Sequence, residues 1–170
     1  QARASTSAPF PVAYGRGVGA ACLGVFGLFL LIALLLPAGA TPTLAGVAAA
    51  FYRAGALVFG GGHVVLPLLQ QSVVAPGWVA PDTFLAGYGA AQAVPGPMFS
   101  LAAFLGAEMP LGLPPAVGAL VALLAVFVPG FLLLVAVLPL WQGLARRPRA
   151  AGAMAGINAA VVGLLAAAFI

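Results

Sequence analysis

Charged side chains are scarce in this sequence. Only 5% of its 170 residues are Asp, Glu, Lys or Arg, whereas a soluble globular domain carries about a quarter. Hydrophobic residues make up 64% of the chain, and the mean hydropathy is +1.21. This composition excludes an ordinary soluble domain, and we expect an integral membrane protein.

The residues that usually carry catalysis or bind metals are also few. The chain has a single cysteine, Cys22, and a single histidine, His63. One cysteine excludes a disulfide framework, and this pair matches no recognised zinc spacing. The two acids, Asp82 and Glu108, lie far apart and supply no nucleophile with an adjacent base. We therefore expect no enzyme, no catalytic residues, no metal and no cofactor.

Three of the six arginines form the cluster "RRPR" at 146–149, between two apolar runs. An excess of Lys and Arg in a short loop predicts that the loop stays on the cytoplasmic side of a membrane. Nucleic-acid binding is the weaker alternative because three arginines make a poor electrostatic footprint. We expect the lipid bilayer, and no nucleic acid, as a partner.

The apolar runs 18–36 and 115–141 are each long enough to cross a hydrocarbon core of about 30 Å as a helix. A further run, 150–170, follows the arginine cluster. Residues 1–16 are polar and contain proline, which predicts a linker or tail, and 17–170 form the expected transmembrane domain. The predicted fold is an all-α, polytopic helical bundle in a membrane, in a chain that we expect to be part of a longer protein.

Two apolar segments in the middle of the chain are interrupted near their centres. Segment 44–75 contains "GGG" at 60–62, and segment 81–108 contains "PGP" at 95–97. Each interruption leaves arms of roughly 11 to 16 residues, or about 16 to 24 Å of helix, which is too short to span comfortably. Each segment is either one broken spanning helix or a re-entrant hairpin, and the sequence leaves both alternatives open.

Such interruptions are typical of ion and substrate sites in membrane proteins. Backbone groups freed at a break must face protein or a wet cavity, and the N-terminus of a half-helix directs N–H donors at anions. Arg53 lies two helical turns before Gly60, on the same predicted helix face. Its planar guanidinium group can donate paired hydrogen bonds to an oxyanion. Snorkelling of Arg53 to an interface is the alternative. The candidate anion-binding residues are Arg53, Gly60, Gly61, Gly62, His63, Gln92, Pro95, Gly96, Pro97 and Ser100.

Several polar residues also have a simpler structural interpretation. His63 either caps the second half-helix or contacts a substrate or proton, and Gln92 either forms a helix-packing hydrogen bond or belongs to the site. Asp82 in "PDTF" predicts a solvated helix start. Glu108 is expected at an interface, with proton coupling as the alternative, and Asn158 is expected to hydrogen-bond between helices.

Five stretches together resemble the chromate ion transporter family. These are "GALVFGGGHVVLPLLQQSVV" (55–74), "GW" (77–78), "FLAGYGAAQAVPGPMFSLAAFLGAE" (84–108), "GALVALLAVFVPGFLLL" (118–134) and "AGINAAVVGLLAAA" (155–168). They occur in order over about residues 43–170, and the similarity is greatest to the second half of long-chain members. FGGG followed at this spacing by AQAxPGP is the specific part of the pattern.

The resemblance implies a multi-pass transporter of the cell inner membrane that exports chromate, with sulfate as a close structural competitor. It also implies a partner, which is either a homologous N-terminal half or a second copy of the domain. A non-transporting membrane scaffold or subunit, and a transporter of sulfate or another anion, are the alternative functions.

Overall fold

A computed structural model describes residues 14–37, 39–58, 62–94 and 99–145, together with 152, 156–157, 159–163 and 167. All regular secondary structure in these residues is helical, which confirms the predicted all-α fold class. The chain divides into two compact units. We call residues 23–133 the central unit, and residues 1–22 with 134–170 the terminal unit, and describe each by itself.

Two long apolar helices match the predicted runs closely. Helix α1 covers Arg16–Leu35 and α6 covers Pro115–Ala145. Among the described residues, these are the two helices long and apolar enough to cross a membrane. Only 11% of the most apolar window of α1 is buried, so most of its apolar surface faces outward, as on a lipid-exposed helix.

The first interrupted segment forms two arms. Helix α2 covers Leu44–Leu57, and α3 covers Gly62–Leu69 and continues into the π-helical turn η1, Gln70–Val74. The predicted start at 44 is confirmed by a cap, because the Thr43 side chain accepts a hydrogen bond from the Gly46 backbone N–H at 3.1 Å. Residues 59–61, which connect the arms, lie outside the described residues.

The second arm, α3–η1, runs back along α2, so that its last residues lie near the start of α2. Trp78, four residues after η1, is 3% exposed and packs against Gly46 near the start of α2. Its Nε1 donates to the carbonyl of Gly39 at 2.8 Å, before α2. The arms α2 and α3–η1 therefore form a helical hairpin, which we call the first hairpin.

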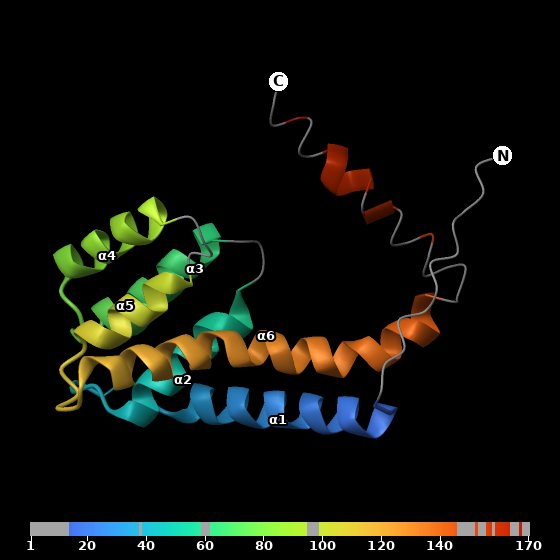
Figure 1. Cartoon of the computed structure of the whole chain (residues 1–170), viewed down its shortest axis with the longest axis horizontal. Helices are drawn as coiled ribbons and strands as arrows, with labels where there is room; N and C mark the ends of the chain where they lie inside the picture. Colours follow the sequence, from blue (N-terminus) through green and yellow to red (C-terminus); the bar gives the residue numbers. More distant parts are fainter. Residues whose placement is uncertain are drawn as a thin grey trace. The chain divides into compact units, whose positions relative to one another are not determined.

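The second interrupted segment also forms a hairpin. Helix α4 covers Pro81–Ala93 and α5 covers Ser100–Glu108. The two helices lie side by side (Figure 1), and a Cβ added at Gly87 of α4 would come 3.2 Å from the Leu101 side chain of α5. We call this pair the second hairpin.

The core of the central unit is apolar and is shared by both hairpins and α6. Van der Waals packing of these side chains holds the hairpins against α6. The fully buried large side chains of this core are Val47, Phe51, Leu69, Val73, Phe84, Leu101 and Leu105.

The terminal unit contains the start of α1 and the end of α6. Gly19 of α1 lies against Ala136 and Pro139, since a Cβ at Gly19 would come 3.0 Å from the Ala136 carbonyl oxygen. The Tyr14 hydroxyl donates to the carbonyl of Val135 at 3.3 Å. The arginine cluster at 146–149 and Asn158 lie outside the described residues.

Candidate functional site

Both hairpins meet α6 at two consecutive residues. Gly55, in the last turn of α2, lies so close to α6 that an added Cβ would come 2.8 Å from the Val126 carbonyl carbon. The ring of Phe99, directly before α5, packs edge-on against the ring of Phe127 with centroids 5.2 Å apart. The end of α2 and the end of the loop before α5 therefore lie at the same height along the axis of α6, which we call the level of Val126 and Phe127.

That level is far from either end of α6. Twelve residues separate Pro115 from Phe127, which corresponds to about 18 Å along the helix axis. Phe127 also lies 18 residues before Ala145, so the level is well inside the helix. The arms lie side by side, which is the geometry of the hairpin alternative rather than of one straight helix interrupted at its centre.

Arg53 is on α2, one turn before the end of that helix. It is partly buried between two buried neighbours, Tyr52 and Ala54, and lies two residues before the close contact of Gly55. The side-chain hydrogen bonds found among the described residues do not involve Arg53. The predicted shared helix face of Arg53 and Gly60 requires a helix that continues to residue 60, but α2 ends at Leu57 and Val58 has an extended backbone. That prediction is therefore wrong.

Gln92 and Ser100 lie at the same end of the second hairpin. Gln92 is in the last turn of α4, Ser100 is the first residue of α5, and both are exposed. The Gln92 Nε2 donates to the Tyr88 hydroxyl at 2.6 Å, within α4. The structure therefore places these two predicted residues at the same end of the second hairpin, and the hydrogen bond of Gln92 lies within one helix rather than between helices.

The other predicted site residues are not described in side-chain detail. Helix α3 begins at Gly62, the third glycine, which is one residue earlier than the predicted start after all three. The side-chain surroundings of Gly62 and His63 lie outside the described residues. The remaining candidates fall in the two connections outside the described residues: Gly60, Gly61, Pro95, Gly96 and Pro97.

Both acids lie away from the ends that meet at Val126 and Phe127. Asp82 is exposed in the first turn of α4, which confirms the predicted helix start at this position. Glu108 is exposed at the last position of α5. Among the described residues no three His, Cys, Asp or Glu side chains gather into a metal-binding group.

Sequence reasoning missed Tyr88 and the glycines that contact α6. Tyr88 and Gln92 are four residues apart, so their helical i, i+4 spacing was a usable signal for the pair. Gly55 carried no such signal, because its partner Val126 is 71 positions away in the sequence.

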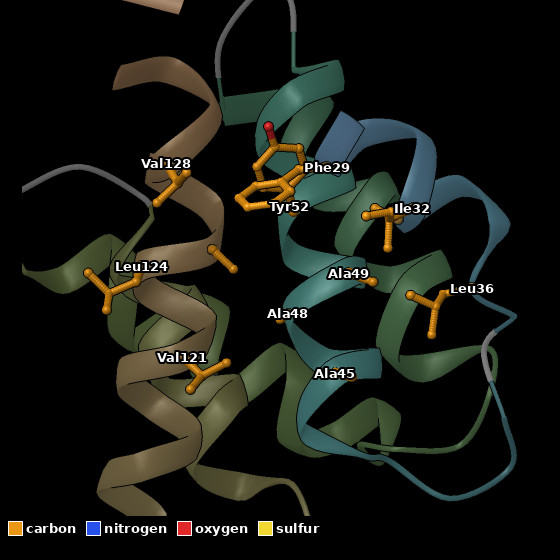
Figure 2. A pocket seen from close by; sticks show the side chains of 12 residues that line it. Phe29, Ile32, Leu36, Ala45, Ala48, Ala49, Tyr52, Val121, Leu124 and Val128 are labelled. Carbon is orange, nitrogen blue, oxygen red and sulfur yellow. The ribbon is translucent and has the colours of Figure 1, made fainter. Parts of the chain in front are cut away.

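A cavity of about 440 Å³ lies elsewhere in the central unit, between α1, α2 and α6 (Figure 2). Its one side-chain polar group is the Tyr52 hydroxyl, which already donates to the carbonyl of Phe26 at 3.1 Å. An oxyanion needs several donors when it leaves water, and these walls supply none that is free. The cavity is lined by Phe29, Ile32, Ala33, Leu36, Ala45, Ala48, Ala49, Tyr52, Val121, Leu124, Ala125 and Val128.

Comparisons with known proteins point to one family. A family model described as "Chromate transporter" matches residues 45–170. The "Probable chromate transport protein" of Synechococcus elongatus is 33% identical over 136 residues, 79% of this chain and 34% of that protein. The "Chromate transport protein" of Cupriavidus metallidurans is 32% identical over 130 residues, 76% of this chain and 31% of that protein.

A third relative, the "Chromate transport protein" of Pseudomonas aeruginosa, is 30% identical over 115 residues, or 68% of this chain and 27% of that protein. The chain thus spans about a third of the length of the curated relatives it matches. The position of the family match fits the predicted placement as a second half. No solved structure matches the chain.

Proposed function

Because the chain belongs to the chromate transporter family, we propose that it is part of a transporter that exports chromate across the inner membrane. The family consists of transporters, and the apolar helices α1 and α6 suit a membrane setting. The activity proposed here is that of the whole protein. It includes a partner for this domain, either a homologous N-terminal half or a second copy.

One observation carries the proposed site: the ends of both hairpins contact α6 at Val126 and Phe127. This supports a binding site between the two interruptions, since the chain segments on either side of them approach one level. The starts of α3 and α5 each offer free backbone N–H groups, and helix N-termini favour anions.

Charge is the second requirement of an oxyanion site. Arg53 is partly buried one turn before the end of α2, close to the level at which the hairpins meet α6. A guanidinium binds oxyanions through paired N–H donors, and an arginine within an apolar segment is costly unless it is used. The proposed substrate-binding residues are Arg53, Gly60, Gly61, Gly62, His63, Gln92, Pro95, Gly96, Pro97 and Ser100.

Sulfate has the same charge and tetrahedral geometry as chromate. Hydrogen bonds and a positive charge bind both ions, so the described residues give no physical basis for choosing between them. The names of the relatives favour chromate as the substrate. Competition by sulfate is therefore part of the proposal.

Chromate uptake by inside-out membrane vesicles that contain the full natural protein tests this function. Export from the cytoplasm becomes uptake in such vesicles, and right-side-out vesicles serve as the control for direction. We expect Arg53→Gln and Gly61→Leu to lower uptake about tenfold or more, and Arg53→Lys to fall between, because lysine keeps the charge but not the paired donors.

Wild-type uptake in both Arg53→Gln and Gly61→Leu would reject the site. A correctly inserted wild-type protein that takes up no chromate would reject the function and favour the alternative of a membrane scaffold. Thermal unfolding of the purified protein provides an independent comparison. A saturable rise in melting temperature with chromate or sulfate supports a binding site, whereas no shift at millimolar concentrations supports the scaffold.

A further inference from the structure

Tyr88 and Gln92 form a polar pair on α4, at the end of the second hairpin that leads into "VPGP". The Gln92 amide Nε2 donates to the Tyr88 hydroxyl oxygen at 2.6 Å. The Tyr88 ring is partly buried against the core of the central unit, while Gln92 is exposed. The core thus holds the ring, and the ring fixes the position of the amide.

The pair keeps two hydrogen-bond donors after its internal bond is made. With Nε2 donating, the phenol O–H and the second amide N–H are left over. If the amide is turned by 180°, the phenol donates to Oε1 and both amide N–H groups are left. Either orientation leaves two neighbouring donors, and in an apolar chain such donors belong beside water, protein or a polar ligand.

The position of the pair within the second hairpin relates it to the start of α5. Gly87 of α4 contacts Leu101 of α5, so Gln92, farther along α4, lies toward the end where α5 begins. The backbone N–H groups of Ser100 and Leu101, at the start of α5, lie at that end, whereas the Ala102 N–H donates to the Phe99 carbonyl at 2.9 Å. Phe99, directly before α5, contacts α6 at the level described above.

We propose that Tyr88 and Gln92 act as one neutral donor unit that binds the transported oxyanion beside the start of α5. This inference rests on the proposed function and adds to it a binding residue, Tyr88, and the hydrogen bond that orients Gln92. Neutral donors suit a transport site, because they add to binding without the full attraction of a second charge, which would slow release.

A double-mutant cycle in the full natural protein tests the pair. Tyr88→Phe removes only the hydroxyl, Gln92→Leu removes the amide, and the third variant combines both. The measurements are the KM for chromate uptake into inside-out vesicles and the melting temperature without ligand. Tyr14→Phe is the matched control, because it removes a hydroxyl that hydrogen-bonds to Val135 in the terminal unit.

If the two residues act as one unit, each single variant raises KM on the order of tenfold, and the double variant is little worse than either single one. The control keeps the wild-type KM. Single variants that keep the wild-type KM, whether or not they melt earlier, overturn the proposal and leave a structural role for the pair. Effects that multiply in the double variant overturn the idea of one unit.

Failure of the proposed function gives a different result. A wild-type protein that takes up no chromate rejects the transport function and, with it, this assignment. A wild-type protein that transports chromate while the variants match it rejects only the role of Tyr88 and Gln92.

Discussion

Gly106 of α5 and Gly118 of α6 are packed backbone to backbone. A Cβ added at Gly106 would overlap the Gly118 carbonyl group, and a Cβ added at Gly118 would overlap the Gly106 carbonyl oxygen. Only glycine allows two helices to approach this closely. Together with the contact of Phe99 with Phe127, this packing makes α5 antiparallel to α6 and fixes its level along that helix.

Gly118→Ala is expected to destabilise the protein by about 1 to 3 kcal/mol, because the new methyl group meets backbone that cannot move away freely. The measurement is thermal unfolding of the purified protein in detergent. Gly130→Ala is the matched control in the same helix, since nothing lies within 4 Å of a Cβ at that position. Equal melting temperatures for the two variants would contradict the close packing of α5 on α6.

Gly87→Ala and Gly89→Ala make a second matched pair, on α4. A Cβ at Gly87 would meet the side chains of Phe104 and Leu101, whereas Gly89 has open space. Side chains yield more easily than backbone, so we expect Gly87→Ala to cost about 1 kcal/mol, less than Gly118→Ala. Gly89→Ala should be neutral or slightly stabilising because alanine is the better helix former. If both variants unfold at the same temperature, α4 and α5 do not pack as described.

Trp78→Phe is expected to weaken the contact between the start of α2 and the end of the second arm of the first hairpin. The change removes the indole N–H donated to Gly39, leaves that carbonyl without its partner, and takes volume from a buried site beside Gly46. We expect a loss of about 2 kcal/mol in the free energy of unfolding. Trp141→Phe is the control, because Trp141 is 46% exposed. A loss no greater than that of the control would exclude a structural role for this bond.

Thr43→Ala should remove the cap of α2. The Thr43 hydroxyl accepts from the Gly46 N–H, and loss of an N-cap of this kind costs about 1 kcal/mol. Thr43→Ser keeps the accepting oxygen and should restore most of that stability. Circular dichroism on heating measures both variants, with Thr41→Ala, an exposed position before the helix, as the control.

The helix boundaries could be predicted from the sequence because they depend on local signals. A capping threonine precedes Leu44, prolines stand at 81 and 115, and "MPLG" follows Glu108; the structure begins or ends a helix at each of these positions. The family resemblance was equally local, since FGGG and AQAxPGP are short motifs at a defined spacing, and the family match confirms it.

The candidate site was less predictable. Arg53, Gln92 and Ser100 are candidates because of their residue type and their spacing from an interruption, and the structure gives the helices on which they lie. The roles proposed for them stay predictions. Tyr88 was missed because an aromatic residue in an apolar helix is most often part of a core, which is where its ring packs.

The sequence by itself determined that this is a helical membrane protein with two interrupted segments, because composition and helix-breaking residues act over a few neighbouring positions. Whether those segments run straight on or fold back was decided only by tertiary contacts between distant residues. Gly46 meets Trp78, Gly87 meets Leu101, and Gly55 meets Val126. Such pairs depend on which helix surfaces fit together closely, and surface fit between distant segments has no signature in either segment alone.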